Sequence, residues 1–128
     1  MKQGIWIVLL VLYAAAIGYM SHQPLGLGES PFSHFDKLIH IAEFGLFLLL
    51  SWLATGRRLL LAWFLTMAYA GSDELHQAII PTRHASLLDF AADGVGASLM
   101  AGLIYRRQLL WRFFAPRILE RERATRRK

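Results

Sequence analysis

Residues 36–54 read DKLIHIAEFGLFLLLSWLA, a stretch that begins with charged residues and continues as a long apolar run. Three more apolar stretches of similar length occupy residues 5–21, 59–77 and 87–105. A helix of about 20 residues spans the ~30 Å hydrocarbon core of a bilayer, because each residue adds about 1.5 Å. Backbone polar groups inside lipid must be paired within their own segment, so only a helix suits runs of this length. We therefore predict an all-α integral membrane bundle of four transmembrane helices.

The first of these stretches follows Lys2 and contains three consecutive alanines, a combination that also occurs in cleaved secretory signals. Its apolar residues continue through Met20, beyond the apolar core of most such signals. We expect this segment to be retained as the first membrane helix.

The composition also indicates that lipid is the main solvent of this chain. Of its 128 residues 55% are hydrophobic and 18% are charged, and no cysteine is present to form a disulfide or a thiolate metal site. The net charge of +5 arises in residues 106–128, where nine basic residues accompany two acidic ones. A short basic tail beside an apolar span is typical of contact with anionic lipid headgroups, so we predict membrane lipids and no nucleic acid as partners.

The chain is thus divided into a transmembrane domain, residues 1–105, and a basic, interfacial tail, residues 106–128. The tail mixes aromatic residues with arginines, which predicts an interfacial helix interrupted at Pro116.

Orientation in the membrane follows from the positions of Lys and Arg. Twelve of the 14 basic residues fall on one side, at Lys2, in the turn with Arg57 and Arg58, and in the tail, while Lys37 and Arg83 fall on the other. Positively charged loops stay inside, so we predict a bacterial inner-membrane protein with both termini in the cytoplasm.

Acidic residues gather at the predicted outer end. Apart from two in the tail, they occupy positions 29, 36, 43, 73, 74, 89 and 93. Residues three and four apart share a helix face, so polar stripes form at the ends of three helices. The stripes contain Asp36, Lys37, His40 and Glu43; then Tyr69, Asp73, Glu74, His76 and Gln77; and finally Ser86, Asp89 and Asp93.

Ionisable groups at the centre of a span cost at least ~2.5–3.5 kcal/mol each, so we expect these stripes to face the bundle interior together. Up to six carboxylates meet two fixed cations, Lys37 and Arg83, and the cluster must therefore also take up protons, a protonated histidine, a metal or a cationic ligand. The spacing of His40 and Glu43 is not a recognised metal motif, so we assign no metal ligands and leave the cofactor open.

Within this cluster His40 and His76 are candidate general acid/base groups, oriented by Asp36 or Asp73. Lys37 and Arg83 would hold a phosphate or carboxylate. The ligand-binding candidates are Lys37, Glu43, Glu74, Gln77, Arg83, Asp89 and Asp93. The alternative interpretation is an ion-pair network that only holds the bundle together.

Packing of the fourth stretch follows from its small residues. Gly94, Ser98 and Gly102 form one row and Ala97 and Ala101 another, and such rows let helix backbones approach closely.

Several sequence blocks stand out along the chain: DKLIHIAEFG at 36–45, SDELHQ at 72–77, PTR at 81–83 and SLLD at 86–89, followed by Asp93 and Gly96. Together they resemble the VanZ-like family of small polytopic bacterial membrane proteins. The resemblance covers about residues 35–102 and implies a cell-envelope protein without implying a reaction. Position 93 is Asp where the resemblance leads us to expect Asn in many members, which adds a carboxylate to the cluster.

Three functions fit these observations. The first is an outward-facing polar pocket that binds or acts on a lipid-linked or headgroup-like envelope ligand. The second is a non-catalytic accessory or assembly subunit that contacts another membrane protein or a second copy. The third is a proton- or cation-coupled transporter component, which would need to oligomerise because four spans are few. No nucleophile motif accompanies the histidines, so enzymatic activity stays open.

The predicted topology is testable with single cysteines introduced at Gly26 and Thr125. An impermeant thiol reagent added to intact spheroplasts should label Gly26→Cys and spare Thr125→Cys, because the two positions lie on opposite sides. The reverse labelling pattern would refute the orientation.

Overall fold

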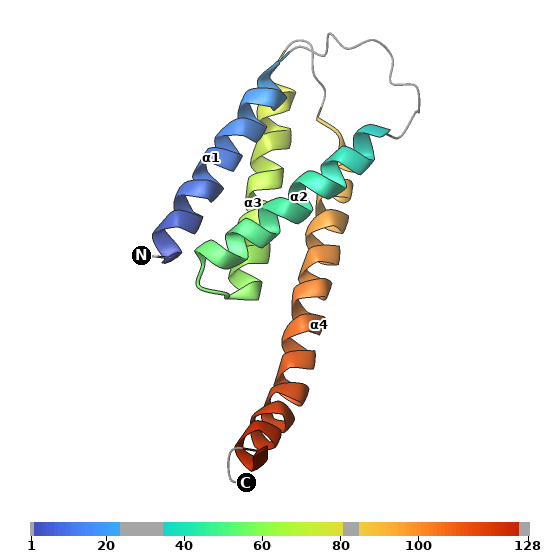
Figure 1. Cartoon of the computed structure of the whole chain (residues 1–128). Coiled ribbons are helices and arrows are strands. Elements are labelled where there is room, and N and C mark those ends of the chain that lie inside the picture. Colours follow the sequence, from blue (N-terminus) through green and yellow to red (C-terminus); the bar gives the residue numbers. More distant parts are fainter. Residues whose placement is uncertain (1, 24–34, 81–84, 126–128) are drawn as a thin grey trace.

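The computed structural model describes residues 2–23, 35–80 and 85–125 of the chain. It contains four α-helices and, within these residues, no strand: α1 (Lys2–His22), α2 (Phe35–Ala54), α3 (Leu59–Ala78) and α4 (Leu87–Thr125). The predicted all-α fold is confirmed (Figure 1).

Three of the four helices are long and apolar enough to cross a bilayer, namely Gln3–His22, Phe35–Ala54 and Leu87–Trp111. The remaining helix, α3, has the same 20-residue length as α2, but its last turns carry a concentration of polar residues. Three of these, Asp73, Glu74 and Gln77, are buried inside the bundle. The chain is thus a membrane protein in which α3 carries buried polar residues in its last turns.

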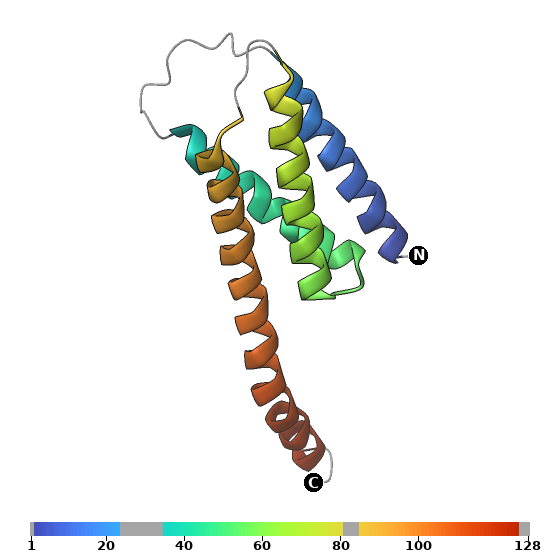
Figure 2. The ribbon, with the colours of Figure 1, turned by 180° about the vertical axis from the view of Figure 1, so that it is seen from behind.

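α2 is the central helix of the bundle. It contacts α1, α3 and α4, and its contact with α4 is the most extensive in the molecule. α1 and α3 lie side by side, while α2 crosses obliquely and α4 extends well beyond the other helices (Figures 1 and 2). The start of α1 and the end of α4 both lie toward the end of the bundle that holds the α2–α3 turn (Figure 1).

The crossing of α2 and α4 depends on two glycines. A Cβ built on Gly96 would overlap with the backbone carbonyl of Ile41, and one built on Gly45 would lie 3.4 Å from the carbonyl oxygen of Gly96. Only glycine at position 96 permits this approach. The neighbouring Ala97 is fully buried in the same region.

The predicted rows of small residues therefore pack against two neighbouring helices, α2 and α3. Gly94 faces the Met67 side chain of α3, and Ser98 accepts a hydrogen bond of 3.4 Å from the Trp63 indole N–H. Gly102 faces open space, so its place in the packing row was predicted wrongly.

Two apolar clusters fill the interior of the bundle. One joins Ile17, Phe44, Phe47 and Ala70, with the rings of Phe47 and Tyr69 stacked at 4.6 Å between centroids. The other is built around buried residues of α2, α3 and α4: Leu48, Ala62, Ala97 and Ile104. The clusters fix the relative positions of the helices below the polar end.

The α2–α3 turn has a defined geometry. The N–H of Arg57 donates to the carbonyl of Trp52 at 2.8 Å and that of Gly56 to Leu53 at 3.4 Å, the hydrogen-bond pattern of a Schellman motif. Both Gly56 and Arg57 have positive φ, of 67° and 69°. Glycine adopts this conformation readily, whereas arginine does so at a cost.

α4 corrects one prediction. The helix continues past the expected end at residue 105 and past Pro116, where an interruption was predicted, and ends at Thr125. Proline removes one backbone hydrogen bond without preventing helix on either side. The division into a membrane domain and a tail at this point stays a prediction.

The Gly96 contact makes a prediction about stability. Gly96→Ala should lower the free energy of unfolding by about 1–3 kcal/mol, because the added methyl group forces α2 and α4 apart. Gly102→Ala is the matched control and should be neutral or stabilising by up to about 1 kcal/mol, since alanine favours the helix and the site is open. Denaturant titration in detergent measures both; equal losses would contradict the assignment of the crossing point.

Candidate functional site

The first turns of α2 and α4 are joined by two polar contacts. The Lys37 ammonium forms an ion pair with Asp89 and contacts Asp36 at 2.9 Å. One turn further along both helices, Nδ1 of His40 lies 2.8 Å from Oδ1 of Asp93. The spacings 37–40 and 89–93 place both pairs on facing helix stripes. The carboxylate beside His40 is thus that of Asp93, rather than Asp36 or Asp73 as predicted.

The start of α4 is held in place by a side chain from α3. Ser86 accepts a hydrogen bond from the N–H of Asp89 at 3.2 Å and acts as the N-cap. Its own N–H donates to Oε2 of Glu74 at 2.7 Å. Glu74 therefore connects α3 to the beginning of α4. This contact fixes the position of Asp89 and Asp93 along the bundle axis.

A second polar group joins α1 to α3. The Ser21 hydroxyl and the Gln77 amide both donate to Oδ2 of Asp73, at 2.8 and 2.9 Å. Next to them the rings of His22 and His76 stack at 5.6 Å, with their nearest nitrogens 3.4 Å apart. Asp73 is 6% exposed, so its charge is compensated mainly by these hydrogen bonds.

Ser21 and His22 were not among the predicted site residues. α1 is apolar almost to its end and carries no polar stripe, so helical spacing gave no signal there. Their position at the end of the span, level with the polar end of α3, was the available clue.

Glu43 lies three residues beyond His40 on α2 and therefore shares a helix face with it. The described site residues of α2, α3 and α4 thus lie at a single end of the bundle. Arg83 falls outside the described residues, so its role stays a prediction.

Within the described side chains the cluster has one fixed cation, and one buried carboxylate oxygen has no hydrogen bond. Among the residues whose side chains the structure describes, Lys37 is the one fixed cation beside six carboxylates at this end. Oε1 of Glu74 is buried and has no hydrogen-bond partner among the described residues. Within the same residues no group of three or more His, Cys, Asp or Glu side chains is arranged to hold a metal ion.

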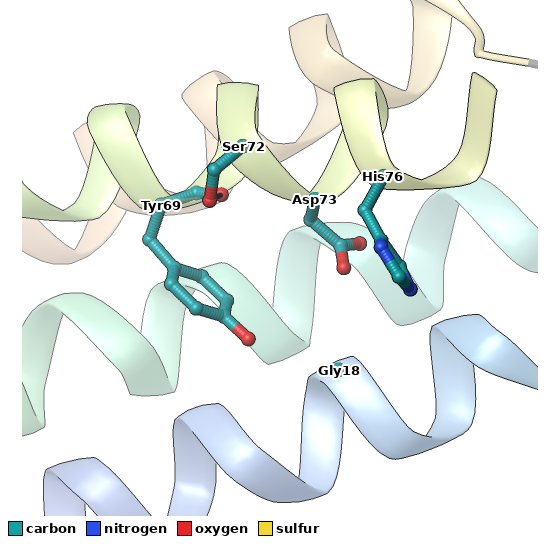
Figure 3. A pocket seen from close by; sticks show the side chains of 5 residues that line it. All are labelled: Gly18, Tyr69, Ser72, Asp73 and His76. Carbon is teal, nitrogen blue, oxygen red and sulfur yellow. Dashed lines mark hydrogen bonds between the residues drawn. The ribbon is translucent and has the colours of Figure 1, made fainter. Parts of the chain in front are cut away.

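A pocket opens between α1 and α3 beside this cluster (Figure 3). It has a volume of about 240 Å³ and is lined by Gly18, Tyr69, Ser72, Asp73 and His76. The Asp73 carboxylate and the His76 ring both extend from α3 toward α1 (Figure 3). His40 and Asp93 do not line it. The pocket and the His40–Asp93 pair are therefore distinct parts of one polar region.

Family comparison decides the assignment. Residues 5–112, which include every predicted site residue, match the VanZ/LLP1 family model. The chain belongs to the VanZ/LLP1 family. No curated protein and no solved structure matches it. The VanZ-like resemblance predicted from the sequence blocks is confirmed, and the match includes all of α1 from Ile5 onward.

This arrangement gives the VanZ/LLP1 chain specific chemical capacities. His40 uses Nδ1 for Asp93, and its Nε2 has no partner among the described side chains, which is the disposition of an imidazole that exchanges protons. At the α1–α3 pocket the polar atoms are mainly acceptors. The Tyr69 and Ser72 hydroxyls donate to the carbonyls of Ala14 and Tyr69, at 2.6 and 2.7 Å, so their oxygens remain free to accept.

The two acidic partners of Lys37 allow a matched stability test. The side chain of Asp89 is 16% exposed and that of Asp36 is 55% exposed. Asp89→Asn should therefore cost about 1.5–3 kcal/mol of unfolding free energy and Asp36→Asn less than about 1 kcal/mol. Chemical denaturation in detergent measures both; a larger loss for Asp36→Asn would contradict the described pairing.

Proposed function

We propose that this VanZ/LLP1 protein binds the polar headgroup of a lipid-linked cell-envelope compound in the pocket between α1 and α3. The pocket lies among membrane helices, so a ligand with a lipid anchor reaches it from within the bilayer. Its volume of about 240 Å³ falls just below the ~300–1,000 Å³ range of ligand sites, which suits a headgroup rather than an entire lipid.

The observation that carries the proposal is the acceptor character of the pocket. Asp73 offers a carboxylate. The Tyr69 and Ser72 hydroxyls donate their hydrogens to backbone carbonyls, so their oxygens offer lone pairs to a ligand. A ligand that displaces water from these acceptors must supply donors in its place, because an acceptor left without a partner on binding costs about 1–3 kcal/mol. Ammonium groups and sugar hydroxyls are such donors, whereas a bare phosphate is not.

The shortage of cations supports the same ligand chemistry. Even when Arg83, which lies outside the described residues, is counted with Lys37, six carboxylates outnumber two fixed cations and leave this end of the bundle negatively charged wherever the acids are ionised. An amine-bearing headgroup would relieve that charge. In the predicted orientation this end faces away from the cytoplasm, toward the compartment where envelope precursors are used.

Proton transfer is a separate capacity of the same region. His40 and Asp93 have the geometry of a proton-exchanging pair but lie outside the pocket lining. We therefore propose binding as the function and assign no reaction step.

An assembly role is the second candidate, and the interhelical contacts favour it. Lys37 with Asp89, His40 with Asp93, and Ser21 with Asp73 each bridge different helices. A network of this kind stabilises the bundle by itself, and the exposed face of the pocket would then meet another membrane protein.

A photoreactive benzophenone residue in place of Ser72 tests the proposal in living cells. Ser72 lines the pocket, and the control position is Leu75, which lies on the same helix, is 73% exposed and does not line the pocket. The probe at position 72 should capture a lipid with an amine- or hydroxyl-bearing headgroup, while the probe at position 75 captures bulk phospholipid. Mass spectrometry of the extracted adducts identifies both.

Asp73→Asn, combined with the position 72 probe, should lower the specific capture about tenfold, because a hydrogen bond to a charged group is worth ~1.5–3 kcal/mol and 1.4 kcal/mol corresponds to a factor of ten. Identical lipids at positions 72 and 75 would refute the headgroup site. Capture of a protein at position 72 alone would favour the assembly role instead.

A further inference from the structure

A second pocket lies at the opposite end of the bundle, between the start of α1 and the α2–α3 turn. Its volume is about 290 Å³, and it is lined by Gln3, Trp6, Leu53, Gly56 and Arg57. The Gln3 side chain donates to the carbonyl of Ala54 at 3.0 Å and so ties α1 to the end of α2. The proposed headgroup site makes no use of these residues.

Arg57 is the charged residue of this pocket and is held in an unusual conformation. Its φ is 69°, in the left-handed region that arginine adopts at a cost. Its guanidinium lies 5.6 Å from the centre of the Trp52 ring, a cation–π contact that orients the planar group. The side chain is therefore prearranged although it is exposed.

No acidic side chain that the structure describes pairs with Arg57. The ion pairs among the described side chains all lie at the opposite end and involve Lys37 or His40. Arg58 adds a second cation beside Arg57 and is the N-cap of α3, where no side chain caps the helix. The positive end of the α3 dipole thus faces the same turn.

We infer that this pocket binds the phosphate of an anionic phospholipid. The Arg57 guanidinium matches a phosphate in charge and in its paired donors. Trp6 and Leu53 supply an apolar wall for the adjoining glycerol and chain, and tryptophan is typical of the headgroup level of membrane proteins. The lipid is favoured over free phosphate because the pocket combines one charged group with apolar lining at the end of membrane-spanning helices.

Arg57→Gly provides a test that should leave the turn intact, because glycine adopts a positive φ without strain and the change removes only the exposed Arg57 side chain. Arg57→Asn serves as a second variant, since asparagine also tolerates this conformation. Arg107→Gln is the control: Arg107 is an exposed arginine on α4, and its replacement removes the same charge. All proteins are purified in a neutral detergent, and their melting temperatures are measured against increasing phosphatidylglycerol.

Phosphatidylglycerol should raise the melting temperature of the wild-type protein, as a ligand of the folded state does. Phosphatidylcholine with the same chains and inorganic phosphate at equal concentration should not. Apparent affinity for phosphatidylglycerol should fall about tenfold in Arg57→Gly and Arg57→Asn, and stay unchanged in Arg107→Gln.

Four results would overturn the inference. They are an absent wild-type response, an equal response to phosphatidylcholine, an unchanged affinity in both Arg57 variants, and an equal loss in Arg107→Gln. Stabilisation by inorganic phosphate alone would show a simple anion site in place of a lipid site.

Discussion

The close crossing of α2 and α4 is the constraint on which the polar end depends. At Gly96 the backbones approach so closely that no side chain fits between them. The first turns of the two helices converge just before this point, which brings His40 within 2.8 Å of Asp93 and pairs Lys37 with Asp89. A methyl group at the crossing would separate the helices and lengthen these contacts, so packing at one glycine sets the geometry of the charged groups.

Hydrogen-bond donors, rather than cations, compensate most of the buried acids. Asp73 accepts from a hydroxyl and an amide, and Glu74 accepts from the N–H of Ser86. Neutral donors avoid the desolvation cost of burying further lysines, and they hold the helices in register. They leave net negative charge behind, however, and Oε1 of Glu74 without a partner among the described residues. A region built this way has residual capacity for protons or for a donor-bearing ligand.

The sequence predicted the helices well because the length of an apolar run limits the length of a membrane helix. α2 and α3 begin and end within one residue of the predicted 36–54 and 59–77. The end of α4 was not predictable in this way, since a helix leaving the membrane is no longer limited by bilayer thickness, and Pro116 does not end it.

The pairing of the polar residues was less accessible to sequence reasoning. Spacing within a helix shows which residues share a face, but not how far one helix is shifted or rotated against the next. His40 was therefore assigned to Asp36 or Asp73 and lies beside Asp93. Ser21 and His22 were missed because two polar residues at the end of an apolar helix form no stripe.

The opposite charges of the two ends cannot neutralise each other. Arg58 precedes α3 and Asp73 lies fifteen residues further along, a separation of about 20 Å at 1.5 Å per residue. Two unit charges at that distance interact by about 1 kcal/mol at an effective dielectric constant of 20, against about 4 kcal/mol at 4 Å. Each end must therefore find counter-charges nearby. We therefore propose protons and donor groups as the counterparts of the acidic end and lipid phosphates as those of the basic end, so that the division of charge along the bundle would select different ligands for the two pockets.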